Sequence, residues 1–148
     1  DLHPRVRRQR QMCIRDSFTP KKVVQMMVDQ LVETEPHIFE SPDKTFVDFY
    51  MKSGLYITEI VKRLYRNKVL KSIIPDDKKR VKHILECQVF GFAPTQIIYD
   101  ITMSYIFGFD EEAKKISRRN FFCEDTLPYA ERGELQKLVN EKLGDRVK

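Results

Sequence analysis

The chain has 148 residues, of which 41% are hydrophobic and 33% charged, and its formal net charge is +5. This length predicts about one domain with a buried core, and the composition excludes a disordered chain. The apolar runs are too short to span a bilayer and no signal segment is visible, so we expect a cytoplasmic protein.

The three cysteines stand far apart, at Cys13, Cys87 and Cys123. They lack the Cys-x-x-Cys spacing, so the sequence predicts neither a zinc site nor a disulfide framework. We expect reduced thiols, with Cys87 and Cys123 in the core because both lie in apolar stretches. The three histidines are scattered and predict no metal site.

The first 17 residues differ from the rest of the chain. They contain five arginines and two aspartates, and so carry three of the five net charges. They show no periodicity, and residues 8–17 resemble the translated sequencing-adapter read-through found at the ends of some metagenomic reading frames. The alternative is a basic arm that contacts nucleic acid phosphates. We expect a non-native or disordered leader over residues 1–17 and one partial domain over residues 18–148.

From residue 18 onward the pattern predicts helices that alternate with strands. Thr19 is expected to cap a helix that starts at Pro20. Apolar residues at helical spacing give this helix one buried face: Val24, Met27, Val28, Leu31 and Val32. A polar loop over residues 33–43 leads to a strand over 45–49. A helix follows over residues 53–66, with an apolar face made of Leu55, Ile57, Ile60, Val61 and Leu64.

The second half continues the alternation. A linker over residues 73–77 precedes a helix that Asp76 or Asp77 caps and that ends near Glu86. The basic run over residues 78–82 is interpreted as a solvated helix face. The remaining expected elements are a strand over 88–92, a helix over 96–107 ended by Gly108, a strand over 120–125 and a helix over 134–143. This order predicts a parallel α/β sheet with right-handed crossovers, which binds ligands beyond the carboxyl ends of its strands.

Four short motifs carry a resemblance to a known family. They are Phe18-Thr-Pro20, Asp48-Phe-Tyr-Met-Lys-Ser-Gly54, Val89-Phe-Gly-Phe-Ala-Pro94 and Phe121-Phe-Cys-Glu-Asp-Thr-Leu127. Their order resembles the cofactor-binding motifs of S-adenosylmethionine-dependent methyltransferases, in particular the adenine-specific DNA methylases of restriction–modification systems. The resemblance covers about residues 18–125. It implies a Rossmann-like parallel sheet flanked by helices, here as an incomplete methyltransferase domain.

The resemblance also implies a site for S-adenosylmethionine at the strand tips. Phe18 and Thr19 would flank the methionine end of the cofactor, and Asp48 would lie near its amino group. Gly54 would let the backbone approach the ligand closely, and Asp125 would read the adenine amino group. The other implied cofactor-binding residues are Tyr50, Ser53, Ala93, Pro94 and Thr126.

Three of the four motifs also have a structural interpretation. Thr19 suits an ordinary helix start, Asp48 and Gly54 suit a capped turn, and Asp125 suits a cap for residues 126–129. Two residues depart from the family pattern: Lys52 stands at a glycine position, and Ala93 stands where the family has an acid that holds the ribose hydroxyls.

The sequence contains no (Asn/Asp)-Pro-Pro-(Tyr/Phe) tetrapeptide, with which the family holds the flipped target adenine. We therefore expect an N-terminal fragment of such an enzyme that binds cofactor weakly, has no catalytic or metal-binding residues of its own, and meets double-stranded DNA only through the full-length protein. One alternative is a Rossmann-like structural or interaction module that has lost cofactor binding. Another is a methyltransferase that acts on RNA or protein.

Overall fold

The computed structural model describes residues 19–108 and 110–147, so Phe18 and the leader expected over residues 1–17 lie outside the described residues. The described residues form one parallel sheet of three strands in the order β1-β2-β3. The strands are β1 (Phe46–Asp48), β2 (Val89–Ala93) and β3 (Phe121–Cys123). The register pairs Asp48 with Gly91, and Gly91 with Phe121. The predicted parallel α/β sheet is confirmed, and its order matches one half of a doubly wound sheet.

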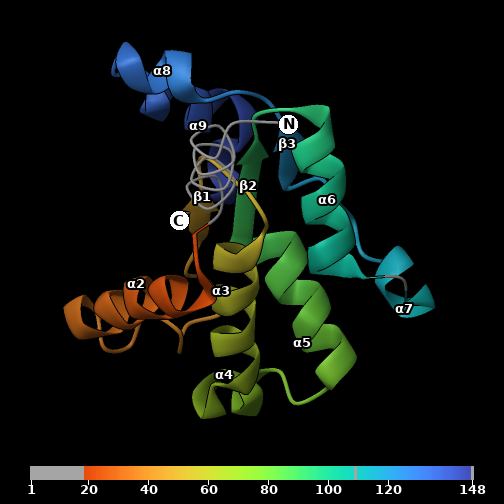
Figure 1. Ribbon diagram of the computed structural model, residues 1–148. Coiled ribbons are helices and arrows are strands. Elements are labelled where there is room, and N and C mark those ends of the chain that lie inside the picture. The colour runs from red at the N-terminus through yellow and green to blue at the C-terminus, as the bar shows by residue number, and fades with distance from the viewer. Residues whose placement is uncertain (1–18, 109, 148) are drawn as a thin grey trace, which may run out of the picture.

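Helices connect the strands and flank the sheet (Figure 1). Before β2 they are α2 (Lys21–Thr34), α3 (Leu55–Arg66), α4 (Lys68–Ile73), α5 (Asp77–His83) and a π-helical turn (Ile84–Gln88). After β2 they are α6 (Gln96–Phe107), α7 (Glu111–Lys114), α8 (Leu127–Glu131), α9 (Leu135–Lys142) and a 3-10 turn (Gly144–Arg146). The sequence did not predict α4, α7 and α8, because four to six residues are too few to show helical periodicity.

The two faces of β2 point into two separate cores. Val89 and Ala93 belong to the larger core, which α2, α3 and α6 also enter. Phe90 and Phe92 belong to the smaller core, which α9 covers. This alternation follows the two-residue period of a strand. Three aromatic rings stack in a row in this smaller core. The Phe92 ring of β2 lies between Phe49, just after β1, and Phe122 of β3, with ring centroids 6.1 and 5.1 Å away.

Local signals begin and end the helices at several expected positions. The Asp76 carboxylate accepts the N–H of Lys79 at 2.8 Å and so begins α5, which decides between the two predicted caps. Gly108 ends α6 as predicted, with a φ of +64° that other residues rarely adopt. The apolar face predicted for α3 is confirmed, since Ile57, Ile60 and Leu64 are buried.

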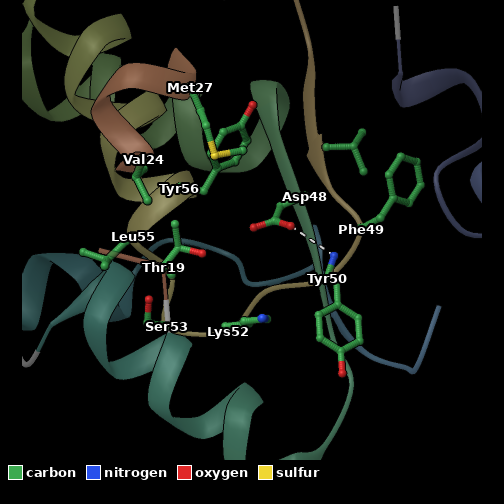
Figure 2. A pocket seen from close by; sticks show the side chains of 12 residues that line it. Thr19, Val24, Met27, Asp48, Phe49, Tyr50, Lys52, Ser53, Leu55 and Tyr56 are labelled. Carbon is green, nitrogen blue, oxygen red and sulfur yellow. Dashed lines mark hydrogen bonds between the residues drawn. The ribbon is translucent and has the colours of Figure 1, made fainter. Parts of the chain in front are cut away.

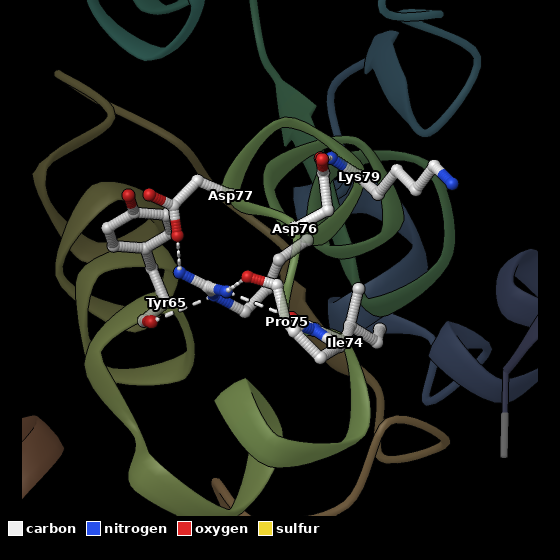
Figure 3. Close-up of polar contacts among 7 residues, drawn as sticks. Tyr65, Ile74, Pro75, Asp76, Asp77 and Lys79 are labelled. Carbon is white, nitrogen blue, oxygen red and sulfur yellow. Dashed lines mark hydrogen bonds and ion pairs between the residues drawn. The ribbon is translucent and has the colours of Figure 1, made fainter.

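Arg80 connects α5 to the turn before it, and Figure 3 shows its partners Tyr65, Ile74, Pro75 and Asp77. Its guanidinium donates to the carbonyls of Tyr65, Ile74 and Pro75 at 3.1, 2.9 and 3.2 Å, and it pairs with the Asp77 carboxylate. It also lies 4.5 Å from the centre of the Tyr65 ring. With 1% of its surface exposed, Arg80 contradicts the prediction that the basic run is wholly solvated. The burial is tolerated because these acceptors replace water.

The prediction that Cys87 and Cys123 lie in the core is wrong, because both are exposed. Cys123 is the last residue of β3, where the strand leaves the core, and Cys87 lies on the outer side of the π-helical turn. Over residues 19–108 and 110–147, no helix is long and apolar enough to cross a membrane. The same residues contain no group of three or more His, Cys, Asp or Glu side chains that could hold a metal ion.

Candidate functional site: a pocket at the tip of β1

A pocket of about 200 Å³ lies at the carboxyl end of β1, between the start of α2 and the start of α3 (Figure 2). It brings together five of the predicted site residues: Thr19, Asp48, Tyr50, Ser53 and Gly54. Thr19 comes from a segment nearly thirty residues before β1, so the fold unites two of the motifs singled out in the sequence.

Thr19 does not cap α2, contrary to the prediction. Pro20 takes the N-cap position, its carbonyl accepts the N–H groups of Val23 and Val24, and no described side chain caps the helix. The side chain of Thr19 instead borders the pocket. The interpretation of Thr19 as an ordinary capping residue is therefore excluded.

Asp48 ends β1 with its carboxylate inside the pocket. One carboxylate oxygen accepts the N–H of Tyr50 at 3.0 Å. Burial raises the pKa of Asp48 above its ordinary value, although the Tyr50 N–H opposes this shift. Burial and the charge of Asp48 together raise the pKa of Tyr56, whose ring also lines the pocket. A poorly solvated carboxylate in this position favours a cationic partner.

Gly54 ends the loop and forms the N-cap of α3 with a φ of +80°, a conformation that L side chains rarely adopt. A Cβ at this position would lie 3.4 Å from Tyr105 and Ile106, so Gly54 also lets the loop pass close to α6. No side chain of the described residues caps α3. The first N–H groups of this twelve-residue helix therefore have no side-chain acceptor among the described residues, and N–H groups of this kind attract anions.

Lys52 borders the same pocket and is exposed. A positive φ is confined to glycines in the part of the chain that the structure describes, so the loop holds Lys52 without backbone strain. With the described residues, Lys52 makes no ion pair. The loop thus differs from a glycine-rich loop by carrying a free cation at the pocket.

Met51 fastens this loop to β2. Its N–H donates to the carbonyl of Phe92 at 2.8 Å, three residues beyond the end of β1. Its side chain is fully buried and packs directly on Gly91, where an added Cβ would lie 2.3 Å from the Met51 sulfur. The position of the pocket loop therefore requires glycine at position 91, because any side chain there would occupy the space that Met51 fills.

The predicted residues of the β2 tip do not reach the pocket. Ala93 is fully buried, and its carbonyl accepts the N–H of Glu124 at 2.8 Å. Pro94 is half-buried between β2 and α6. Neither the Ala93 methyl group nor its carbonyl is therefore available to hold a ligand.

The predicted residues of the β3 tip also lie outside the pocket. The Asp125 carboxylate accepts the N–H of Leu127 at 3.1 Å, which is the capping role that the sequence left open. Thr126 is buried, and its hydroxyl donates to the carbonyl of Phe49. Thr126 thereby ties the loop after β3 to the loop after β1.

Two pocket residues of α2, Val24 and Met27, were assigned to the helix core by the sequence pattern alone. Val24 is buried as expected, whereas 46% of the Met27 surface is exposed, and both form the apolar wall that α2 contributes. They stand three residues apart on one face of α2, and they follow Thr19 closely in the sequence. This spacing is the signal from which their place in the pocket could have been predicted.

Comparisons with known proteins find a partial similarity to a curated protein. No protein-family model matches the chain, and no solved structure matches it. Over 79 residues the chain is 34% identical to a protein of Mycoplasma pneumoniae named "Uncharacterized adenine-specific methylase". The matched region covers 53% of this chain and 18% of that protein, so the chain spans less than a fifth of the length of this relative.

Proposed function

We propose that this chain is the cofactor-binding part of an S-adenosylmethionine-dependent methyltransferase, and that the full-length protein methylates adenine in double-stranded DNA. The observation that carries the proposal is the pocket at the tip of β1, which unites Thr19, Asp48 and Gly54 from two separate motifs. The partial similarity to a methylase supports the methyltransferase family. A restriction–modification setting follows from the motif resemblance.

The pocket residues fit the methionine end of S-adenosylmethionine, which carries an ammonium and a carboxylate group. Asp48 offers a poorly solvated carboxylate to the ammonium group, and the open start of α3 offers N–H groups to the carboxylate. The volume of about 200 Å³ lies below the roughly 300–1,000 Å³ of sites for drug-sized ligands. The pocket therefore takes one end of the cofactor and leaves the adenosine outside, over the strand tips.

The adenosine end has less support from the described residues. The Ala93 side chain is buried, and a methyl group cannot accept hydrogen bonds from ribose hydroxyls. Glu86 lies before the amino end of β2, where its carboxylate accepts the N–H of Ser117, and the Asp100 carboxylate accepts a hydrogen bond from Gln96. Neither acid replaces the missing acceptor, so we expect weak binding.

S-adenosylmethionine, when bound, supplies a methyl group activated by its sulfonium. The residues of this chain bind and orient the methionine end: Asp48 by charge, α3 through its N–H groups, and Val24 and Met27 by apolar contact. The 148 residues contain no (Asn/Asp)-Pro-Pro-(Tyr/Phe) tetrapeptide to hold a flipped adenine. We therefore expect this chain to bind the cofactor without transferring its methyl group.

Isothermal titration with S-adenosylmethionine tests the proposal, with Asp48→Asn as the pocket variant and Asp76→Asn as the matched control. The Asp48 carboxylate lies in the pocket, whereas the exposed Asp76 carboxylate caps α5 outside it. We expect the wild-type chain to bind and Asp48→Asn to bind at least about tenfold more weakly, the size expected for a lost charge-assisted hydrogen bond. Asp76→Asn should bind like the wild type. No binding heat from concentrated, folded wild-type protein would refute the proposal.

Two features favour a second candidate, a Rossmann-like interaction module without cofactor. Ala93 leaves the β2 tip without a ribose acceptor, and Lys52 replaces a glycine of the loop. A folded wild-type chain that binds no cofactor would support this candidate. A full-length enzyme that methylates RNA or protein would share the same pocket, and transfer of a labelled methyl group to DNA, RNA or protein separates these substrates.

A further inference from the structure

We propose that Lys52 is a specificity-determining residue of the pocket at the tip of β1, whose ammonium group binds the carboxylate of an amino-acid ligand. The inference rests on the proposed function and goes beyond it, because the family pattern has glycine at this position. It assigns a binding role to one of the two residues that depart from the family pattern.

Lys52 stands where its ammonium group can reach a ligand in the pocket. Lys52 lies on the loop that joins Tyr50 to Ser53, at the edge of the pocket (Figure 2). Its side chain is exposed, and it forms no ion pair within residues 19–108 and 110–147. An ammonium group on a flexible stem beside an open pocket is available to an anion.

The pocket is lined by one acidic and one basic side chain. Asp48 and Lys52 supply one carboxylate and one ammonium group, and they are the acidic and basic residues that line the pocket. An α-amino acid carries both opposite charges on one carbon atom, so the pocket complements each of them. Asp48 repels a carboxylate, which leaves Lys52 and the open start of α3 to bind it.

The two charges have not neutralised each other. Burial raises the pKa of Asp48, with only the Tyr50 N–H acting in the opposite direction. A lysine ammonium paired with Asp48 would lower that pKa. Lys52 is therefore left for a ligand rather than used to close the pocket.

The backbone of Lys52 is held in place on both sides, whereas its side chain is exposed. Before it, Met51 is fully buried and hydrogen-bonded to β2, and two residues after it, Gly54 is buried against α6. The backbone between them is thus fastened at both ends, while the Lys52 side chain extends into solvent. Such an arrangement selects a ligand by charge more than by shape.

The test compares two ligands that differ only in the carboxyl group: S-adenosylhomocysteine and its carboxamide. Titration calorimetry measures both with the wild-type chain, Lys52→Gln and Lys52→Arg, and with Lys62→Gln as a matched control. Lys62 is an exposed lysine on α3 that does not line the pocket. We expect the wild type to prefer the carboxylate about tenfold, the effect of one charge-assisted hydrogen bond. Lys52→Gln should lose most of this preference, because only the N–H groups at the start of α3 then remain to attract the carboxylate. Lys52→Arg and Lys62→Gln should keep it.

The outcomes separate this inference from the proposed function. If Lys52→Gln prefers the carboxylate as strongly as the wild type does, the inference is overturned while cofactor binding stands. If Lys52→Gly, which restores the family residue, binds S-adenosylhomocysteine more tightly than the wild type, lysine obstructs the site and the inference is also overturned. If the folded wild-type chain binds neither ligand, the proposed function itself fails and the inference fails with it.

Discussion

Replacing Gly91 with alanine should displace the loop that forms the pocket. The added Cβ would lie 2.3 Å from the Met51 sulfur, 2.9 Å from its Cε and 3.1 Å from its Cγ. The Met51 side chain is fully buried, so it has little free space into which it can turn. Overpacking of this kind costs about 1–3 kcal/mol. We expect Gly91→Ala to lower the free energy of unfolding by this amount and to weaken ligand binding at the pocket.

Urea unfolding of four proteins tests this contact: the wild type, Gly91→Ala, Met51→Ala and the double variant. Met51→Ala alone empties a buried site and should cost about 2–5 kcal/mol. In the double variant the new methyl group occupies part of the emptied space, so its stability should be close to that of Met51→Ala. This corresponds to a coupling energy of about 1–3 kcal/mol. Costs that add within roughly 0.5 kcal/mol would refute the reasoning that Met51 against Gly91 holds the loop.

Two further predictions concern charged residues. Arg80→Met removes the donor to the carbonyls of Tyr65 and Ile74, and it should lower the free energy of unfolding in urea by about 3–5 kcal/mol. Lys79→Met, at an exposed neighbour, should change it by no more than about 0.5 kcal/mol. Equal losses for the two variants would contradict the role given to Arg80. Burial raises the pKa of Asp48, so its charged form destabilises the folded state above that pKa. Asp48→Asn should therefore melt at a higher temperature than the wild type at pH 7, and the gain should shrink as the pH falls through the raised pKa, because the wild-type carboxyl group then becomes neutral. A gain independent of pH would contradict this explanation.

The strands and long helices could be predicted because their signals are local. The start of α5 at Asp76 and the end of α6 at Gly108 follow from cap residues, and the buried face of α3 follows from its spacing. The burial of Arg80 could not be predicted, because the carbonyls that accept its hydrogen bonds come from a turn that no local pattern describes. A run of basic residues looks the same whether or not one of them turns inward.

Part of the candidate site could be predicted because its residues are close in the sequence: Asp48 and Gly54 flank one loop. Thr19, which the motif resemblance named, reaches the same pocket because α2 packs against α3. Ala93 ends β2 and Asp125 follows β3, as Asp48 ends β1. Ala93, however, is buried and hydrogen-bonded to the loop after β3, and Asp125 caps a turn. Sequence spacing located the strand tips, but side-chain burial at those tips depends on how the following loops fold over them.

Backbone amide NMR during titration with S-adenosylhomocysteine shows whether the pocket at the tip of β1 binds the methionine end of the cofactor. We expect chemical-shift changes concentrated at Thr19 and residues 47–56, with the largest changes at the start of α3. An unchanged spectrum would contradict binding at this pocket. So would changes confined to another cavity, such as the one of about 410 Å³ lined by Lys78, Lys82 and Phe107.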